Sequence, residues 1–364
     1  MSKNKTNLFT FTTKLFYEDI NGDLTANGSG LDELLFPSTR SSLESEVQLD
    51  RYIVNPEGIT FRQKDASSHV RPYKPGKGVF YTIPRSSEIT PITEHLRDSV
   101  IAGAQSASFD DNNAELMTQI VRDHAIGYNK TRIKLALDTC RTGKFIPIDE
   151  SGNALEEGSI DFGRKPENDI AYDFTATSAD IDVALLNIYN AYRNAGGSFA
   201  NICMLMGSGW LHAFSSLPND TKALKRIAMV QSTTQTLNIQ PPQFEDIQGL
   251  HVVGRYLIPG ALAPVWILGY DPGMTWIQKV TDTKSDFMPY DELLCFSTND
   301  ERWSVFGGLD VLNDAGKIER TTGELTFDTF FENDPPTQIM RSQSRWTYIP
   351  GDINKVVRST GTFA

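Results

Sequence analysis

Ser208 is the residue of this chain whose setting most resembles that of a nucleophile. It lies between Gly207 and Gly209, after an apolar run typical of a buried strand and before an expected helix, where a hydrolase nucleophile elbow would place its serine. The pattern Gly-x-Ser-x-Gly is not matched, because Met206 and Trp210 occupy its outer positions. An ordinary strand-to-helix turn therefore explains Ser208 better than catalysis does.

The histidines offer no metal site. They lie at His69, His95, His124, His212 and His251. Neither His-Glu-x-x-His nor another short metal-ligand spacing occurs, so we expect structural or surface imidazoles, no metal and no other cofactor. A cytosolic hydrolase with a site near Ser208 and His212 stays open as the alternative from the enzyme class.

Binding of phosphates or nucleic acid has little support. The segment Pro-Gly-Lys-Gly at 75–78 lacks the Walker spacing of a phosphate-binding loop, and a turn of a hairpin explains it better. The chain has 34 Lys and Arg against 46 Asp and Glu, a formal charge of -12. Sequence-specific recognition of nucleic acid uses basic patches, so it is not expected here.

Cysteine usage and the N-terminus indicate a cytoplasmic protein. Cys140, Cys203 and Cys295 are widely spaced, odd in number and without a Cys-x-x-Cys pair, which predicts buried, reduced thiols rather than disulfides or a zinc ribbon. The first residues lack the apolar region of a secretory signal, and no stretch approaches 18 apolar residues. We therefore expect no membrane association.

The first hundred residues do not resemble a self-contained domain. Short strand-like pieces at 51–54, 59–61 and 79–83 are separated by proline and glycine, and they are too few to build a core. A loop system this long usually belongs to a functional arm or a disordered segment. Because it carries aromatic and branched side chains, we expect an arm and a two-stranded hairpin that become ordered on neighbouring subunits.

A long helix is predicted next, over residues 113–142. Asp111 to Asn113 can cap its first turn, apolar residues recur at helical spacing up to Cys140, and Gly143 ends it. Thirty residues at 1.5 Å per residue would span about 45 Å, well beyond the mean helix of about three turns.

The block from 176 to 290 has the pattern of an α/β unit. Thr177 to Asp180 is a capping-box pattern before a helix that ends at Gly196. A buried strand at 201–206, helices near 210–217 and 219–230, and strands at 250–256, 265–268 and 275–280 follow. From 292 onward the chain is β-rich, with strands at 293–297, 303–306, 325–331, 338–345 and 355–357.

The stretch from Gly143 to Asp169 resembles the lambda-like major capsid protein E family of tailed bacteriophages. The resemblance rests on Gly-Lys-Phe at 143–145, Ile-Asp-Phe-Gly-Arg at 160–164 and Glu-Asn-Asp at 167–169. Val70 to Pro75, Ile89 to Pro91 and Glu332 to Pro335 are similar to further segments of that family. One departure is the run from Ser344 to Pro350, where the family commonly has Ser-x-Pro-Leu.

The resemblance implies an α+β, HK97-like capsid fold. It implies an N-terminal arm (1–48), an E-loop hairpin (49–90), a peripheral domain (91–175) with a spine helix (113–142) and a strand pair (144–163), an axial domain (176–290) and a return to the peripheral domain (291–364). The function implied is structural and not enzymatic: a major capsid protein that assembles into the pentamers and hexamers of an icosahedral head enclosing double-stranded DNA.

Residues of the arm and hairpin are the expected subunit contacts. They are Phe9, Phe11, Phe16, Tyr52, Phe61, Arg71, Tyr73, Lys74, Phe80 and Tyr81. The resemblance also implies a decoration protein, a scaffold and a portal as partners, with packaged DNA nearby but not specifically bound. The expected location is the virion, after assembly in the host cytoplasm. An encapsulin-type nanocompartment shell, which shares the fold, remains the second alternative.

Overall fold

The computed structural model describes most of the chain after residue 29. The described residues are 30–50, 78–92, 109–149, 151–156, 158–175, 180–215, 247, 249–271, 275–278, 283–312, 318–333 and 336–363. The predicted helix at 219–230 and the strands at 51–54 and 59–61 lie outside them. Within the described residues, no helix is both long and apolar enough to cross a membrane.

The predicted long helix is present as α4, Phe109–Thr142, and begins four residues earlier than expected. Its apolar residues pack against different clusters at different points along the helix. Leu116 and Ile120 pack in a small cluster with Ile92 and Met340, whereas Ile133, Ala136, Leu137 and Cys140 belong to the main core. One helix thus contacts several parts of the molecule.

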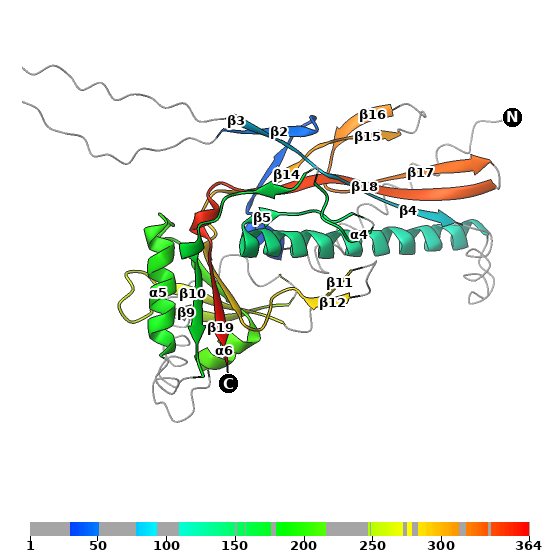
Figure 1. Cartoon of the computed structure of the whole chain (residues 1–364). Helices are drawn as coiled ribbons and strands as arrows, with labels where there is room; N and C mark the ends of the chain where they lie inside the picture. Colours follow the sequence, from blue (N-terminus) through cyan, green and yellow to red (C-terminus); the bar gives the residue numbers. More distant parts are fainter. Residues whose placement is uncertain are drawn as a thin grey trace, which may run out of the picture.

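A five-stranded sheet lies over α4 (Figure 1). Its strands are β1 (Ser38–Ser41), β4 (Arg85–Ile92), β14 (Arg302–Phe306), β17 (Thr326–Asn333) and β18 (Pro336–Pro350). The long strand β18 pairs with β17 and β4 along its first part and with β14 from Trp346 to Pro350, and β1 runs parallel to β14. Strand β18 therefore ties the whole sheet together.

The alternation of side chains along β18 separates two faces of this sheet. Met340, Trp346 and Tyr348 are buried and point to the side of α4, where the Ser344 hydroxyl meets the Tyr128 hydroxyl at 3.1 Å. Arg341 lies on the other face, where Asp328 accepts hydrogen bonds from its guanidinium. The helix side of the sheet is thus the apolar one, as expected for a sheet covered on that face.

A second, six-stranded sheet forms with helices α5 (Ile181–Asn194) and α6 (Ser208–Ser215). Its order is β7 (Asp169–Asp173), β19 (Val357–Thr362), β13 (Glu292–Ser297), β8 (Ile202–Met206), β10 (Val265–Tyr270) and β9 (Leu250–Tyr256). The strands β8, β10 and β13 are buried along their whole length. Such continuous apolar runs are typical of strands covered on both faces.

The two faces of β8 show how the units share a core. Ile202, Met204 and Met206 pack under α5 and α6, whereas Cys203 and Leu205 belong to the cluster that includes the end of α4 and the five-stranded sheet. In Figure 1 the six-stranded sheet accordingly lies below one end of α4, with α5 along its side. Strands β7, β13 and β19 come from outside residues 176–290, so the expected boundaries at 175 and 290 cut across this sheet.

Four two-stranded sheets complete the described fold. They are β2 (Glu46–Asp50) with β3 (Gly78–Thr82), β5 (Lys144–Phe145) with β6 (Ile160–Asp161), β11 (Thr275–Gln278) with β12 (Thr283–Asp286), and β15 (Gly308–Leu312) with β16 (Ile318–Thr322). A short helix, α2 (Leu31–Leu35), packs on α4, and 3₁₀ turns occupy Pro166–Asn168 and Ile353–Lys355.

The capping of α5 differs from the expectation. Asp180 is the N-cap itself, and its carboxylate accepts a hydrogen bond from the Asp182 amide at 2.9 Å. A capping box starting at Thr177 would have made Asp180 the third residue of the helix. The helix therefore begins later than the pattern suggested, at Ile181.

Candidate functional site

The Gly-Ser-Gly turn is explained by packing. Ser208 and His212 are both exposed on α6. A Cβ at Gly207 would collide with the main-chain oxygen of Pro289, and one at Gly209 would lie 2.8 Å from the ring of Phe363. The two glycines are thus required by close contacts with neighbouring segments. Among the described residues, no group of three His, Cys, Asp or Glu side chains could hold a metal ion.

The three cysteines are free and buried, as the sequence predicted. Burial raises the pKa of Cys140 to about 11 and that of Cys203 to about 12, because the thiolate would lose its hydration. Thiols of this kind are poor nucleophiles at neutral pH. These cysteines are core residues in the described structure.

The residues that carry the family resemblance lock the C-terminal end of α4. Gly143 has φ +74°, the left-handed conformation that often ends a helix, and its main-chain oxygen accepts from the Phe162 amide at 3.0 Å. The Arg164 guanidinium donates to the main-chain oxygens of Cys140 at 2.6 Å and Arg141 at 3.0 Å. The motif thus satisfies carbonyl groups that the last turn of a helix leaves free.

Arg164 also reaches the six-stranded sheet. Its second guanidinium nitrogen donates to the main-chain oxygens of Asn168 at 3.2 Å and Val356 at 3.1 Å, and lies 3.3 Å from the Asp169 carboxylate. Burial lowers the pKa of Arg164, although Asp169 opposes this effect. One arginine therefore joins the end of α4 to the segments that enter β7 and β19.

A second ionic contact fixes the same junction. The Glu292 carboxylate, on β13, accepts from Arg141 at the end of α4 at 2.5 and 2.8 Å, and from Arg358 on β19 at 2.5 Å. Burial alone would raise the pKa of Glu292, but the two arginines outweigh it and hold this pKa below its usual value. We call Arg141, Arg164, Glu292 and Arg358 the helix-end joint.

A buried cluster connects the N-terminal helix α2 to α4 and β18. Asp32 and Arg132 are 3% and 6% exposed, and their side chains meet at 2.6 Å. The Tyr348 hydroxyl donates to Asp32 at 3.0 Å, and Glu324 accepts from Arg132 at 2.9 Å. Losing one partner of such a buried pair is costly, because the other charge remains without compensation.

Most of the predicted contact residues lie outside the described part of the chain. These are Phe9, Phe11, Phe16, Tyr52, Phe61, Arg71, Tyr73 and Lys74. Phe80 is on β3, but its side chain is not among those described. Tyr81, also on β3, is half-buried and packs against the main core of its own chain. Their role in subunit contacts stays a prediction.

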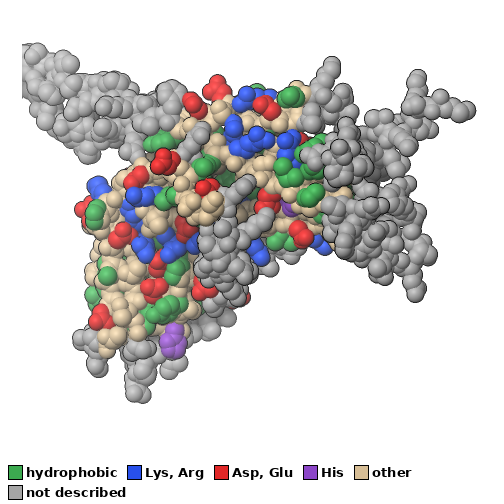
Figure 2. Space-filling model, turned by 45° about the vertical axis from the view of Figure 1, so that its right-hand side comes forward, with side chains coloured by type: hydrophobic (Ala, Val, Ile, Leu, Met, Phe, Trp, Pro, Cys, Tyr) green, Lys and Arg blue, Asp and Glu red, His purple; other side chains and the backbone are tan. Residues whose placement is uncertain are grey.

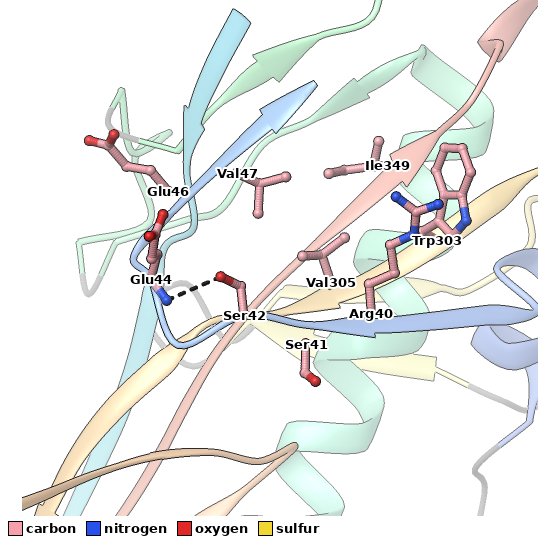
Figure 3. Close-up of a pocket in the computed structure, with 9 residues that line it drawn as sticks. All are labelled: Arg40, Ser41, Ser42, Glu44, Glu46, Val47, Trp303, Val305 and Ile349. Carbon is pink, nitrogen blue, oxygen red and sulfur yellow. Dashed lines mark hydrogen bonds between the residues drawn. The ribbon is translucent and has the colours of Figure 1, made fainter. Parts of the chain in front are cut away.

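The strands β2 and β3 form the base of a hairpin that pairs with no other strand of the described structure. The Ser45 carbonyl accepts a hydrogen bond from the Ile83 amide at 2.9 Å, and the Leu43 main-chain oxygen packs closely on Gly308. These contacts hold the base of the hairpin against the rest of the molecule. A shallow pocket of about 230 Å³ lies beside the base, between β2 and the five-stranded sheet (Figure 3). Sequence patterns gave no indication of this pocket.

The visible surface has mixed character. On the face shown in Figure 2, apolar side chains form small separate areas between charged ones, as far as the described side chains go. Large apolar patches usually mark interfaces. On that face, the described side chains therefore form no single broad apolar patch.

Comparisons with known proteins identify the family. The sequence matches the family described as phage major capsid protein E over residues 29–306. No curated protein matches it at a significant level.

One solved structure gives the fold, and two others are similar at lower scores. A protein of an E. coli CFT073 prophage, assigned as its capsid protein, is similar at a TM-score of 0.57 and 16% identity, with all of both chains covered. The mature capsid of bacteriophage PhiM1 gives 0.46 and 14%, covering 90% of this chain and 86% of that one. The capsid of cyanophage P-SCSP1u gives 0.45 and 10%, covering 93% and 90%.

The first of these structures has a mixed fold of helices and sheets like this chain, and the family match spans most of the sequence. The predicted resemblance is thereby confirmed at the level of the family. The role of such a chain is structural, in the virion, rather than enzymatic. This protein belongs to the phage major capsid protein E family.

Proposed function

We propose that this chain has the HK97-like fold and self-assembles into the pentamers and hexamers of an icosahedral head that encloses double-stranded DNA. The observation that carries the proposal is the match to the phage major capsid protein E family over residues 29–306, together with the fold shared with the prophage capsid protein. Within the subunit, the helix-end joint fixes the two sheets relative to each other. Its arginines connect α4, under the five-stranded sheet, to the six-stranded sheet by partly buried hydrogen bonds to main-chain oxygens and by ionic contacts with Glu292. A subunit that must repeat many times in a shell needs such a defined internal geometry.

The described elements support an assignment of the two sheets to two domains of that fold. The five-stranded sheet with α4 would be the peripheral domain, and the six-stranded sheet with α5 and α6 the axial domain near capsomer centres. The axial domain would then include β7, β13 and β19 besides residues 176–290. Of the expected arm (1–48), α2 and β1 belong to the subunit's own core and sheet, so the arm proper would precede Gly30. The expected E-loop hairpin (49–90) would have β2, from Glu46, and β3 as its base, and would end before β4, which belongs to the five-stranded sheet.

The mechanism is assembly by heterologous contacts that close into rings. Burial of apolar surface at about 25 cal/mol per Å² favours association, against the loss of freedom of the arms and hairpins that become ordered. Aromatic residues predicted for the arm and hairpin, such as Phe9, Phe11 and Phe61, would supply much of this apolar surface. A net charge of -12 opposes close approach of copies, so assembly should improve with salt.

The remaining partners follow from the same proposal. Packaged DNA would lie near the shell without specific recognition, because the chain is acidic. A decoration protein, a scaffold and a portal would complete the particle, and assembly would take place in the host cytoplasm.

Electron microscopy of the full-length chain after overexpression tests the proposal. Closed shells of uniform size are expected, and a chain that stays monomeric at high concentration with or without added salt would refute it. Deletion of residues 2–27, or of the hairpin from 54 to 81, should leave a soluble chain that forms no shells. Normal shells from either deletion would show that the arm or hairpin is dispensable.

A further inference from the structure

The pocket beside the hairpin base has an apolar interior. Val47 of β2, Val305 of β14 and Ile349 of β18 point toward one another in Figure 3, and Trp303 of β14 closes one side. Val305 and Ile349 are buried, whereas Val47 and Trp303 are only half-buried against the core. Covering the exposed apolar surface of these two side chains would be favourable in free energy.

The rim of the pocket is charged. The Arg40 guanidinium lies 4.4 Å from the centre of the Trp303 ring, and Glu44 and Glu46 are exposed on the opposite side. The turn that carries them is fixed by a hydrogen bond from the Glu44 amide to the Ser42 hydroxyl at 3.1 Å. Since Arg40 is engaged with Trp303, the two carboxylates remain available to a cationic partner.

The size of the pocket favours a side chain over a small molecule. Its volume of about 230 Å³ is below the roughly 300–1,000 Å³ of most small-molecule sites. An aromatic side chain in a small, partly apolar pocket is the usual form of an anchor in protein association.

The sequence contains a segment of matching chemistry. Residues 1–17 carry Lys3, Lys5 and Lys14 and no acidic residue, in a chain whose net charge is -12. Phe9 and Phe11 alternate with threonine, so in an extended segment both would point to the same side. This segment precedes Gly30, the first described residue. From Phe9 to Gly30 there are 21 residue steps, which at about 3.3 Å per residue could span at most about 70 Å, so Phe9 could lie far from its own Gly30.

We propose that the N-terminal segment of a second copy binds this pocket, with Phe9 or Phe11 between Val47 and Trp303 and its lysines beside Glu44 and Glu46. The inference rests on the proposed self-assembly, because binding to a second copy links subunits and binding within one copy does not. Apolar burial supplies the anchor, and opposite charges select the partner segment.

Photo-crosslinking in assembled full-length protein tests this assignment. Phe9 and, separately, Phe11 are replaced by p-benzoylphenylalanine, and ¹⁵N-labelled and unlabelled copies are mixed before assembly. Mass spectrometry should find mixed-isotope crosslinks to residues 40–47 or 303–305. The same probe at Thr10, which points to the other side of an extended segment, should crosslink to these residues about tenfold less.

Two outcomes overturn the inference. They are crosslinks confined to one isotope, which mean binding within a copy, and crosslinks that fall on other segments. Electron microscopy of the same samples and of the unsubstituted chain separates the two proposals: shells without the expected crosslinks refute only this inference, whereas an unsubstituted chain that forms no shells refutes both.

Charge reversal at the rim provides a second measurement. Glu44→Lys combined with Glu46→Lys changes two exposed side chains, so the subunit should fold, and the crosslink yield at Phe9 should fall several-fold. Glu167→Lys is the control, because Glu167 is 73% exposed and does not line the pocket. An equal yield in all three proteins would count against the assigned charge contacts.

Discussion

The guanidinium of Arg164 donates to the main-chain oxygen of Cys140 at 2.6 Å, although the two residues are 24 positions apart. This contact closes the end of the longest described helix with a side chain from the segment that follows β6. It also brings the end of α4 against the six-stranded sheet, because the same guanidinium reaches Val356.

Removing the Arg164 side chain should destabilise the folded chain. Arg164→Ala leaves several carbonyl groups at the end of α4 and near β19 without their donor, so we expect the free energy of unfolding to fall by about 2–3 kcal/mol. Urea denaturation of the unassembled chain measures this. Lys165→Ala is the matched control: Arg164 is 5% exposed and Lys165 63%, and the exposed residue should change stability by less than about 0.5 kcal/mol. Equal effects would contradict the role given to Arg164.

Two glycines of the α4 region should respond in opposite directions to alanine. Gly143→Ala forces a side chain into a left-handed conformation, with its Cβ 2.6 Å from that of Arg164, and should destabilise by at least about 1–2 kcal/mol. Gly127→Ala lies within the helix, with nothing within 4 Å of the new Cβ, and should stabilise by up to about 1 kcal/mol. Thermal unfolding of both variants tests the pair. The assignment fails if both shift the melting temperature the same way.

Acid should weaken the helix-end joint. The pKa of Glu292 is lower in the folded chain than its ordinary value of 4.5, so its contribution to stability is present above about pH 4.5 and is lost as the pH falls through the folded-state pKa. Glu292→Gln should cost about 2 kcal/mol at neutral pH, and this difference should shrink below pH 4.5.

Urea titrations across this pH range measure the difference. Glu167→Gln, at an exposed position, serves as the control and should follow the parent chain throughout. A constant difference between the Glu292→Gln variant and the parent would mean that the charge of Glu292 does not carry the effect.

The cysteines should be unreactive in the folded chain. With the pKa of Cys140 at about 11 and both Cys140 and Cys203 buried, alkylation by iodoacetamide at neutral pH should be at least about a hundredfold slower than in urea. Intact mass against time gives the rates. Rapid modification of the native chain would show that these side chains open to solvent.

Elements with strong periodicity were predictable from sequence. The strand β9 has the expected bounds, Leu250–Tyr256, and α5 and α4 are present near their expected positions. In each case the apolar spacing matches the face that is buried, so local sequence and tertiary packing agree. The predicted ends of elements were less accurate. The last strand was predicted at 355–357, but β19 begins at Val357.

Two strands with non-local partners and weak local patterns were missed. Strand β1, Ser-Thr-Arg-Ser, is exposed at every position and exists because its backbone pairs with β14. Strand β7 alternates only weakly and pairs with β19, nearly two hundred residues away. No local pattern encodes such partners, because the backbone groups that pair are the same in every sequence.

Only some residues of the helix-end joint and the buried cluster could be predicted from the sequence. Gly143 and Arg164 were singled out by family resemblance, but their physical role needed the contacts with Cys140 and Val356. The pair Asp32 and Arg132 had no sequence signature, since charged residues are usually assigned to the surface.

The order of strands in the six-stranded sheet affects how the molecule unfolds. Because β7, β13 and β19 enter it from separate stretches, the chain crosses between the two sheets repeatedly. A cut between β13 and β14 would leave strands of both sheets in each of the two fragments, so neither sheet corresponds to one continuous stretch of the chain. Heat or force should therefore melt the described fold in one cooperative event rather than peel it apart piecewise.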